Sequence, residues 1–226
     1  MSGRKILAAL TIGQAPRTDL IPDIEYLLPP DLEIRQYGAL DDLTMLQIEA
    51  AFDPKPGDEI LVSRMRDGSQ AHMTQRFVEP RIQELIHKAE AEGANAVALF
   101  CTGRFGEFAH KGVFLEPQPL LHAVAKALAG GQKIGVLVPV PGQVEQAYES
   151  WGASGVDIFA TCASPYLEFS EVVKAASIFA GKDLAFVCCD CMGYTTQMKQ
   201  AVSEACGLPV LLARSLAARI LAEMLS

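Results

Sequence analysis

Two apolar stretches of this chain end in the same short motif. Residues 96–103 read AVALFCTG and residues 185–193 read AFVCCDCMG. Each is a run of strand-forming residues that stops at a cysteine, Cys101 or Cys191, with a glycine two positions later. The shared ending predicts that the chain consists of two halves of one design.

Short apolar runs alternate with helix-period patterns along the whole chain. The strand-like runs cover residues 6–12, 32–37, 96–101, 134–140, 156–161, 184–189 and 208–212, and a further short apolar strand ends at Pro117 (residues 114–117). Glycines follow several of the predicted helices, at the position where a helix commonly ends. This alternation predicts an α/β fold with parallel sheets covered by helices.

The first half of the chain is the longer one. The interval from Gly13 to Cys101 is 39 residues longer than the interval from Gly142 to Cys191. A segment of about residues 53–75 accounts for most of the difference, and its alternating pattern around Asp67-Gly68 predicts a β-hairpin with a type I′ turn.

We therefore predict two similar Rossmann-like or flavodoxin-like domains related by a pseudo-twofold axis. The first comprises residues 1–116 plus 208–226, with the hairpin inserted in it, and the second comprises residues 117–207. A cleft between them is the expected ligand site, because ligands of parallel sheets bind at the carboxyl ends of the strands.

Composition excludes several classes of protein. Half of the 226 residues are hydrophobic, the formal net charge is −8, and no run of Lys and Arg is interleaved with aromatic residues. We therefore expect no nucleic-acid partner. No apolar run reaches the length of a membrane span, and the six cysteines lack the spacing of a small secreted domain, so we expect a cytoplasmic protein with free thiols.

Cys101 and Cys191 are the candidate catalytic residues. At equivalent strand ends they would approach one cleft from opposite sides, and two such thiols suit removal of a proton from one face of a carbon and its return to the other. This chemistry needs neither a metal nor an organic cofactor. The strand-end loops supply the candidate substrate-binding residues, which are Thr11, Gly13, Gln14, Arg17, Thr102, Gly103, Arg104, Pro139, Gly193, Tyr194 and Thr195.

Less specific interpretations apply to the other chemically active side chains. Cysteine is often buried, so packing is the expected role of Cys162, Cys188, Cys189 and Cys206. The four histidines are scattered and are expected at the surface or in packing, and no metal site is predicted.

Five stretches make the chain resemble the AroM family. They are residues 10–17 (LTIGQAPR), 67–72 (DGSQAH), 113–117 (VFLEP), 136–140 (VLVPV) and 190–194 (DCMGY). More broadly, the paired strand-end cysteines resemble the aspartate/glutamate/hydantoin racemase superfamily.

The superfamily resemblance implies two α/β domains with the site between them, proton transfer without a cofactor, and two catalytic cysteines that correspond to Cys101 and Cys191. It also implies a C-terminal helix that returns to the first domain. This chain has Met192 and Gly193 where racemases usually have Thr and amino-acid racemases then have His. A small acid other than an amino acid, or a cyclic amide, thus remains open as the substrate.

The sequence leads to one hypothesis with two alternatives. The hypothesis is a cofactor-independent racemase or isomerase acting next to a carboxylate or a cyclic amide carbonyl. The alternatives are a non-catalytic protein that binds small carboxylates on the same scaffold, and a lyase or decarboxylase that uses a single cysteine. A homodimer is left open.

Overall fold

The structure is a computed structural model that describes residues 4–226, so the first three residues of the predicted first domain lie outside it. The chain forms two compact units. The first holds the described residues up to Pro117 together with Ala217–Ser226, and the second holds Gln118–Leu216. Among the described residues, no helix is long and apolar enough to cross a membrane.

The first unit is built on a parallel four-stranded sheet in the order β2-β1-β5-β6. Its strands are β1 (Ile6–Thr11), β2 (Glu33–Gly38), β5 (Ala96–Leu99) and β6 (Val113–Leu115). β1 and β5 are buried almost throughout, because helices cover both faces of the sheet.

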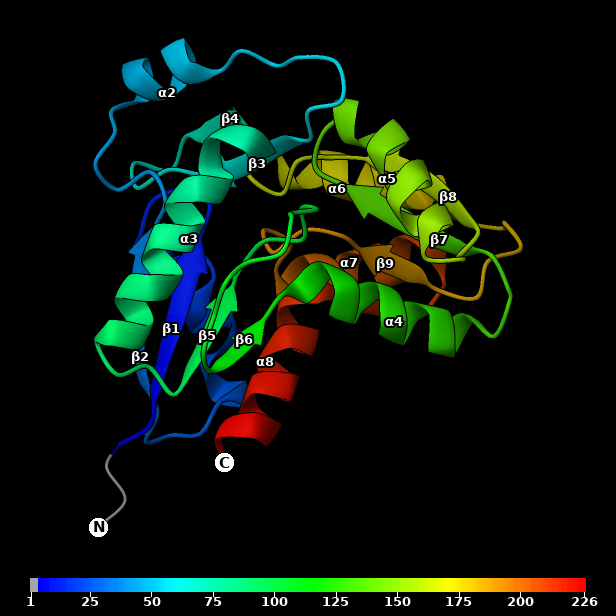
Figure 1. Cartoon of the computed structure of the whole chain (residues 1–226). Coiled ribbons are helices and arrows are strands. Elements are labelled where there is room, and N and C mark those ends of the chain that lie inside the picture. Colours follow the sequence, from blue (N-terminus) through cyan, green and yellow to red (C-terminus); the bar gives the residue numbers. More distant parts are fainter. Residues whose placement is uncertain (1–3) are drawn as a thin grey trace. The chain divides into compact units, whose positions relative to one another are not determined.

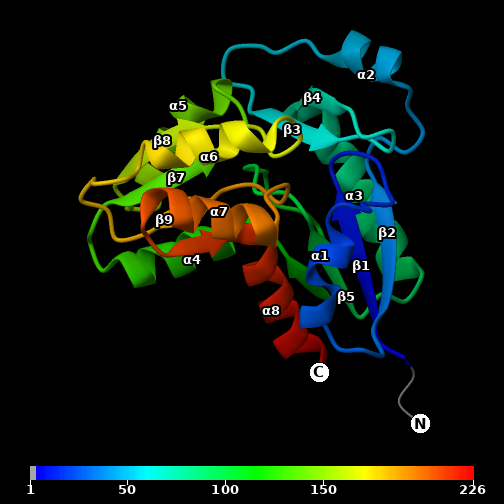
Figure 2. The same cartoon turned by 180° about the vertical axis from the view of Figure 1, so that it is seen from behind.

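Helix α3 (Gln75–Ala91) covers one face of this sheet (Figure 1). The side chains that it buries recur at helical spacing, at Val78, Ile82, Ile86 and Ala89. The short α1 (Ile21–Ile24) lies on the opposite face, as Figure 2 shows. The remaining helical segments are η1 (Glu25–Leu27), α2 (Met45–Ala51) and α8 (Ala213–Leu225), whose last residues belong to the first unit.

The predicted hairpin is present as β3 (Ile60–Arg64) and β4 (Gln70–Thr74). Its turn is not the predicted type I′, which requires a positive φ at two successive residues. In this turn only Gly68 has a positive φ, of 93°. The N–H of Gly68 donates to the carbonyl of Met65, and the N–H of Met65 donates to the carbonyl of Ser69. The connection is therefore a three-residue loop, a type I turn followed by a left-handed glycine, and Asp67 needs no strained conformation.

The second unit repeats the design of the first. Its parallel sheet has the order β10-β9-β7-β8 and its strands are β7 (Ile134–Val138), β8 (Ile158–Cys162), β9 (Val187–Cys189) and β10 (Val210–Leu212). Its helices are α4 (Pro117–Ala129), α5 (Gly142–Ala153), α6 (Phe169–Ser177) and α7 (Thr196–Cys206). α4 and α5 lie on one side of the sheet (Figure 1), and α6 and α7 lie on the other (Figure 2).

Strand order confirms the predicted duplication. If the hairpin is set aside and the strands of each unit are counted along the chain, both sheets have the order second, first, third, fourth. β5 and β9 are then equivalent third strands, and the two Cys-x-Gly motifs follow them directly.

One domain boundary differs from the expectation. We placed residues 208–226 in the first domain, but β10 pairs with β9 and completes the second sheet, so the second unit extends to Leu216. The strand that became β10 was assigned to the first domain because a short apolar run does not reveal which sheet it joins.

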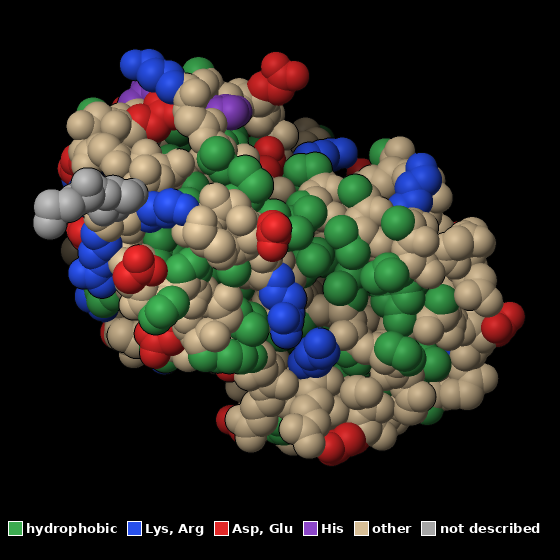
Figure 3. Space-filling model, turned by 90° about the horizontal axis from the view of Figure 1, so that it is seen from below, with side chains coloured by type: hydrophobic (Ala, Val, Ile, Leu, Met, Phe, Trp, Pro, Cys, Tyr) green, Lys and Arg blue, Asp and Glu red, His purple; other side chains and the backbone are tan. Residues whose placement is uncertain are grey.

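Figure 3 shows basic and acidic side chains side by side on one face of the molecule. Basic and acidic groups are scattered there among hydrophobic and neutral ones, and no continuous basic patch is seen on this face.

Candidate functional site

Cys101 lies just beyond the end of β5, at the carboxyl edge of the first sheet. The backbone of the preceding residue extends the ladder, since the N–H of Phe100 donates to the carbonyl of Leu10 in β1. The cysteine side chain is 9% exposed, and the N–H of Gly103 donates to its Sγ at 3.3 Å.

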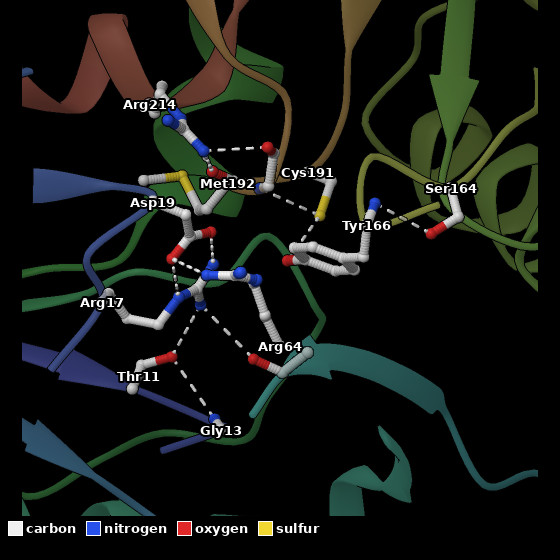
Figure 4. A network of polar contacts seen from close by, with 12 residues as sticks. Thr11, Gly13, Arg17, Asp19, Arg64, Ser164, Tyr166, Cys191, Met192 and Arg214 are labelled. Carbon is white, nitrogen blue, oxygen red and sulfur yellow. Dashed lines mark hydrogen bonds and ion pairs between the residues drawn. The ribbon is translucent and has the colours of Figure 1, made fainter. Parts of the chain in front are cut away.

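Cys191 has the same local geometry beyond β9 of the second sheet. It too is 9% exposed, and the N–H of Gly193 donates to its Sγ at 3.3 Å. The phenol Oη of Tyr166, in the loop after β8, lies 3.8 Å from this sulfur (Figure 4).

The repeated N–H to sulfur contact has a chemical meaning. A hydrogen bond donated to sulfur stabilises the thiolate more than the thiol, and the thiolate is the form that can accept a proton from carbon. Each unit therefore holds one thiol whose sulfur accepts a backbone N–H, at equivalent positions.

The backbone is closely packed at the glycine of both motifs. A Cβ at Gly103 would lie 2.5 Å from Cδ2 of Leu61 in the hairpin. A Cβ at Gly193 would lie 2.6 Å from Cζ and Oη of Tyr166. In the first unit the hairpin thus packs against the Cys101 loop. In the second unit the loop after β8 packs against the Cys191 loop.

Arg17 organises the end of β1 and is itself buried. Its Nε and Nη2 donate to the carboxylate of Asp19 at 2.8 and 2.7 Å, and its Nη1 donates to the Thr11 hydroxyl at 3.1 Å (Figure 4). The same hydroxyl accepts the N–H of Gly13 at 3.3 Å. The predicted role of Arg17 was to bind a substrate carboxylate. Because two nitrogens of its guanidinium donate to Asp19, the side chain is better placed to hold this loop.

Gln14 connects the loop after β1 to the hairpin. Its amide nitrogen donates to the carbonyls of Leu40 and Leu43 at 3.2 and 2.9 Å, and its amide oxygen accepts the N–H of Arg66 at 3.0 Å. The side chain therefore fixes three backbone segments of the first unit.

The other predicted binding residues have varied surroundings. Arg104 pairs with Glu59 at 2.8 Å and is half exposed, and Thr102 beside it is partly exposed. The hydroxyl of Thr195 caps α7 by accepting the N–H of Met198 at 3.1 Å. Pro139 is buried directly after β7.

Tyr194 is not available to a ligand. Its side chain is fully buried, and its hydroxyl donates to the carbonyl of Ala163 at 2.6 Å. Burial raises the pKa of this phenol well above its ordinary value. Tyr194 therefore packs the second unit, and Tyr166 is the tyrosine that lies at the Cys191 sulfur.

Several residues around the Cys191 motif were missed by sequence reasoning. Asp190 accepts the indole N–H of the buried Trp151 at 2.8 Å, and Arg214 of α8 donates to the backbone that follows Cys191. Asp190 could have been noticed beside the cysteine, but nothing in the sequence brings Trp151 or Arg214 to it.

Glu116 is a further residue that the sequence did not single out. It follows β6 at the same carboxyl edge as Cys101, since Leu115 pairs with Ala98 of the neighbouring strand. Burial, together with the negative charge of Glu79, raises the pKa of Glu116 to about 6. This carboxyl group can therefore hold a proton close to neutral pH.

The remaining cysteines fit the packing role expected of them. Cys188, Cys189 and Cys206 are buried, and burial raises the pKa of the first two thiols. Cys162 is partly exposed, and burial also raises its pKa. None of the six cysteines, all of which lie in the described part of the chain, forms a disulfide bond.

His122 is likewise a packing residue. Its ring stacks on Trp151 with centroids 3.8 Å apart, and burial lowers its pKa to about 4. Among the described residues, no three His, Cys, Asp or Glu side chains gather in a group that could hold a metal ion.

Solved structures with the same architecture span several activities. The Picrophilus torridus aspartate racemase matches with a TM-score of 0.62 at 14% identity, over 98% of this chain and 94% of that one. The allantoin racemase from Klebsiella pneumoniae matches with a TM-score of 0.64 at 10% identity, over 97% of this chain and 87% of that one. A liganded double mutant of arylmalonate decarboxylase matches with a TM-score of 0.63 at 14% identity, over 98% and 92%.

At such low identity these similarities establish the fold. A search among curated proteins finds no sequence match. The AroM family model, described as AroM protein, matches residues 7–225, which is nearly the whole chain. The protein therefore belongs to the AroM family, and it shares its two-unit α/β fold with the racemases.

Proposed function

We propose that this protein is a cofactor-independent racemase or isomerase in which Cys101 and Cys191 exchange a proton with a carbon next to a carboxylate or a cyclic amide carbonyl. The observation that carries the proposal is the duplicated thiol. Each sulfur lies at the carboxyl end of the third strand of its unit and accepts the N–H of the glycine two residues later at 3.3 Å.

The proposed reaction moves protons only. One cysteine, as thiolate, removes the proton from the substrate carbon and becomes a thiol, while the electron pair of the broken C–H bond is delocalised into the neighbouring carbonyl. The other cysteine, as thiol, gives its proton to the opposite face of that carbon and becomes a thiolate. Proton exchange with solvent restores the starting state, so no oxidant or reductant is needed.

Similar proteins support the substrate class. The structures that share the fold include aspartate and glutamate racemases, an allantoin racemase and a maleate isomerase. Small acids and cyclic amides are therefore the first compounds to test.

A decarboxylase that uses one cysteine is the second candidate. Arylmalonate decarboxylase has the same fold, and loss of carbon dioxide leaves a carbanion that a single thiol can protonate. A protein that binds small carboxylates without chemistry is the third. It is motivated by Met192 and Gly193, which stand where the resemblance leads us to expect Thr and, for amino-acid racemases, His.

A two-step experiment tests the proposal. First, thermal unfolding is measured with aspartate, glutamate, allantoin, maleate and an arylmalonate, because a ligand of the folded state raises the midpoint. Second, each compound that raises it is incubated with the protein in deuterated water and followed by NMR. The proposal predicts deuterium at the carbon next to the carbonyl, or conversion to the isomer. Carbon dioxide release would support the decarboxylase, and binding without exchange or turnover would support the binding protein.

A further inference from the structure

Arg214 is a fully buried arginine committed to the loop that carries Cys191. It is the second residue of α8, with 0% exposure. Its Nε and Nη2 donate to the carbonyl of Met192 at 2.9 and 2.6 Å, and Nη2 also donates to the carbonyl of Gly193 at 2.9 Å (Figure 4). Moving a guanidinium out of water carries a large desolvation penalty. The hydrogen bonds to the two carbonyls offset part of this penalty, so the buried position of Arg214 depends on them.

The contact reaches the cysteine through one peptide group. The carbonyl of Met192 and the N–H of Gly193 belong to the same planar amide. The oxygen end of that amide accepts the guanidinium, and the nitrogen end donates to Sγ of Cys191 at 3.3 Å. A cation on a carbonyl oxygen polarises the amide and makes its N–H a stronger donor, because hydrogen bonds in a chain reinforce one another.

We infer that Arg214 is a positioning residue that stabilises the thiolate of Cys191 through the Met192–Gly193 peptide. In the resting protein Cys191 is then the base and Cys101 the acid, an assignment of roles that rests on the proposed function.

The first unit lacks this arrangement. Cys101 receives an N–H from Gly103 in the same way, but among the described residues no group donates to the carbonyl of Thr102, which is the other end of that amide. The two motifs share the N–H to sulfur contact, and Arg214 adds a cation at the peptide of the second motif.

Other ionisable groups near Cys191 in the second unit act on it as well. Tyr166 lies at the sulfur, and Cys189 and Tyr194 interact with it electrostatically. The carboxylate of Asp190 directly precedes it, and Lys199 lies near Cys189. Asp190 opposes a negative charge on the neighbouring sulfur, whereas Arg214 favours it.

The test measures the ionisation of Cys191 directly. The full-length protein is alkylated with iodoacetamide over a range of pH, and the modification of each cysteine is followed by peptide mass spectrometry. For Arg214→Met we expect the midpoint for Cys191 to rise by about one pH unit, which lowers its rate at neutral pH up to about tenfold. Cys101 in the same sample is the internal reference, and Arg219→Met, exposed on the same helix, is the matched control.

Two further variants separate charge from structure. Arg214→Lys keeps the cation and is expected to titrate close to wild type, whereas Arg214→Gln keeps a donor without the charge and is expected to titrate like Arg214→Met. If Arg214→Met does not fold, as judged by thermal unfolding, the Lys and Gln pair decides.

An unchanged Cys191 midpoint in Arg214→Gln, or an equal shift at Cys101, would overturn the inference. The alkylation experiment uses no substrate. A rise of the alkylation midpoint confined to Cys191 therefore supports the role of Arg214 even if no turnover is found. In that case only the proposed function fails.

Discussion

The indole N–H of Trp151 donates to the carboxylate of Asp190 at 2.8 Å and thereby joins the core of the second unit to the residue before Cys191. Trp151 is fully buried in α5, where its ring also stacks on His122. The Cys191 loop is thus held by Trp151 from α5 and by Arg214 from α8.

Replacing Trp151 with Phe tests the first of these supports. The variant keeps an aromatic ring but removes the indole N–H that donates to Asp190. We expect the free energy of unfolding to fall by about 2–4 kcal/mol, which includes the effect of the smaller ring. Urea unfolding measures this change. Tyr26→Phe removes a polar group from an exposed ring and should leave the midpoint unchanged. An equal loss in both variants would mean that the hydrogen bond contributes nothing.

Replacing Gly193 with Ala tests the close packing at Cys191. The new Cβ would lie 2.6 Å from ring atoms of Tyr166, and this overpacking is expected to lower the free energy of unfolding by about 1–3 kcal/mol. In the background of Tyr166→Ala the same substitution should cost less, because the Tyr166 ring no longer clashes and only Cγ of Pro165 remains at 2.6 Å.

Gly152→Ala is the matched control for this glycine. Gly152 lies in α5 without a positive φ, and no neighbouring atom lies within 4 Å of the position that an alanine Cβ would take. Alanine there should therefore be neutral or stabilise by up to about 1 kcal/mol. If Gly193→Ala behaved like Gly152→Ala, the packing account of the motif would be wrong.

Replacing Glu116 with Gln tests the raised pKa at the edge of the first sheet. The folded-state pKa of about 6 exceeds the ordinary value of 4.5, so the folded protein holds this proton more tightly than the unfolded chain does. The stability that this provides is present below pH 4.5 and is lost as the pH rises through 6. Glu116→Gln should therefore unfold like wild type at low pH and be more stable by about 1 kcal/mol at neutral pH, after allowance for solvent screening.

Urea unfolding at both pH values checks this prediction. Glu107→Gln, which removes one exposed negative charge from the same unit, is the control for net charge. A stability difference between Glu116→Gln and wild type that is the same at both pH values would contradict the raised pKa.

Most of the fold follows from local patterns in the sequence. The apolar runs and helix periods predicted every strand of the two sheets, including the short β6 beside Pro117, and the Cys-x-Gly repeat predicted their duplication. The ends were less accurate, since β7 stops at Val138 because Pro139 has no N–H for the ladder. The assignment of β10 to a sheet, and the turn at Gly68, depend on tertiary contacts and on one backbone conformation that the residue types alone do not specify.

The site was predictable at its cysteines and less so around them. A thiol followed by a glycine is visible as a local motif, so Cys101 and Cys191 can be paired from the sequence alone. The partners that shape them come from distant parts of the chain, as Leu61 does for Gly103 and Arg214 for Met192. Tyr194 was selected because it lies in the loop that follows Cys191, and only the fold shows that its side chain is buried in the core and that Tyr166 lies at the sulfur.

Proton transfer by both Cys101 and Cys191 is tested by the racemase activity of the two single cysteine variants. Each cysteine is changed to Ser, and interconversion of the two enantiomers of the compound that most raises the unfolding midpoint is followed in deuterated water, from either enantiomer. We predict that each single variant loses interconversion by a factor of at least about 100, because each removes the acid or base on one face. Interconversion at the wild-type rate in either variant would contradict the account.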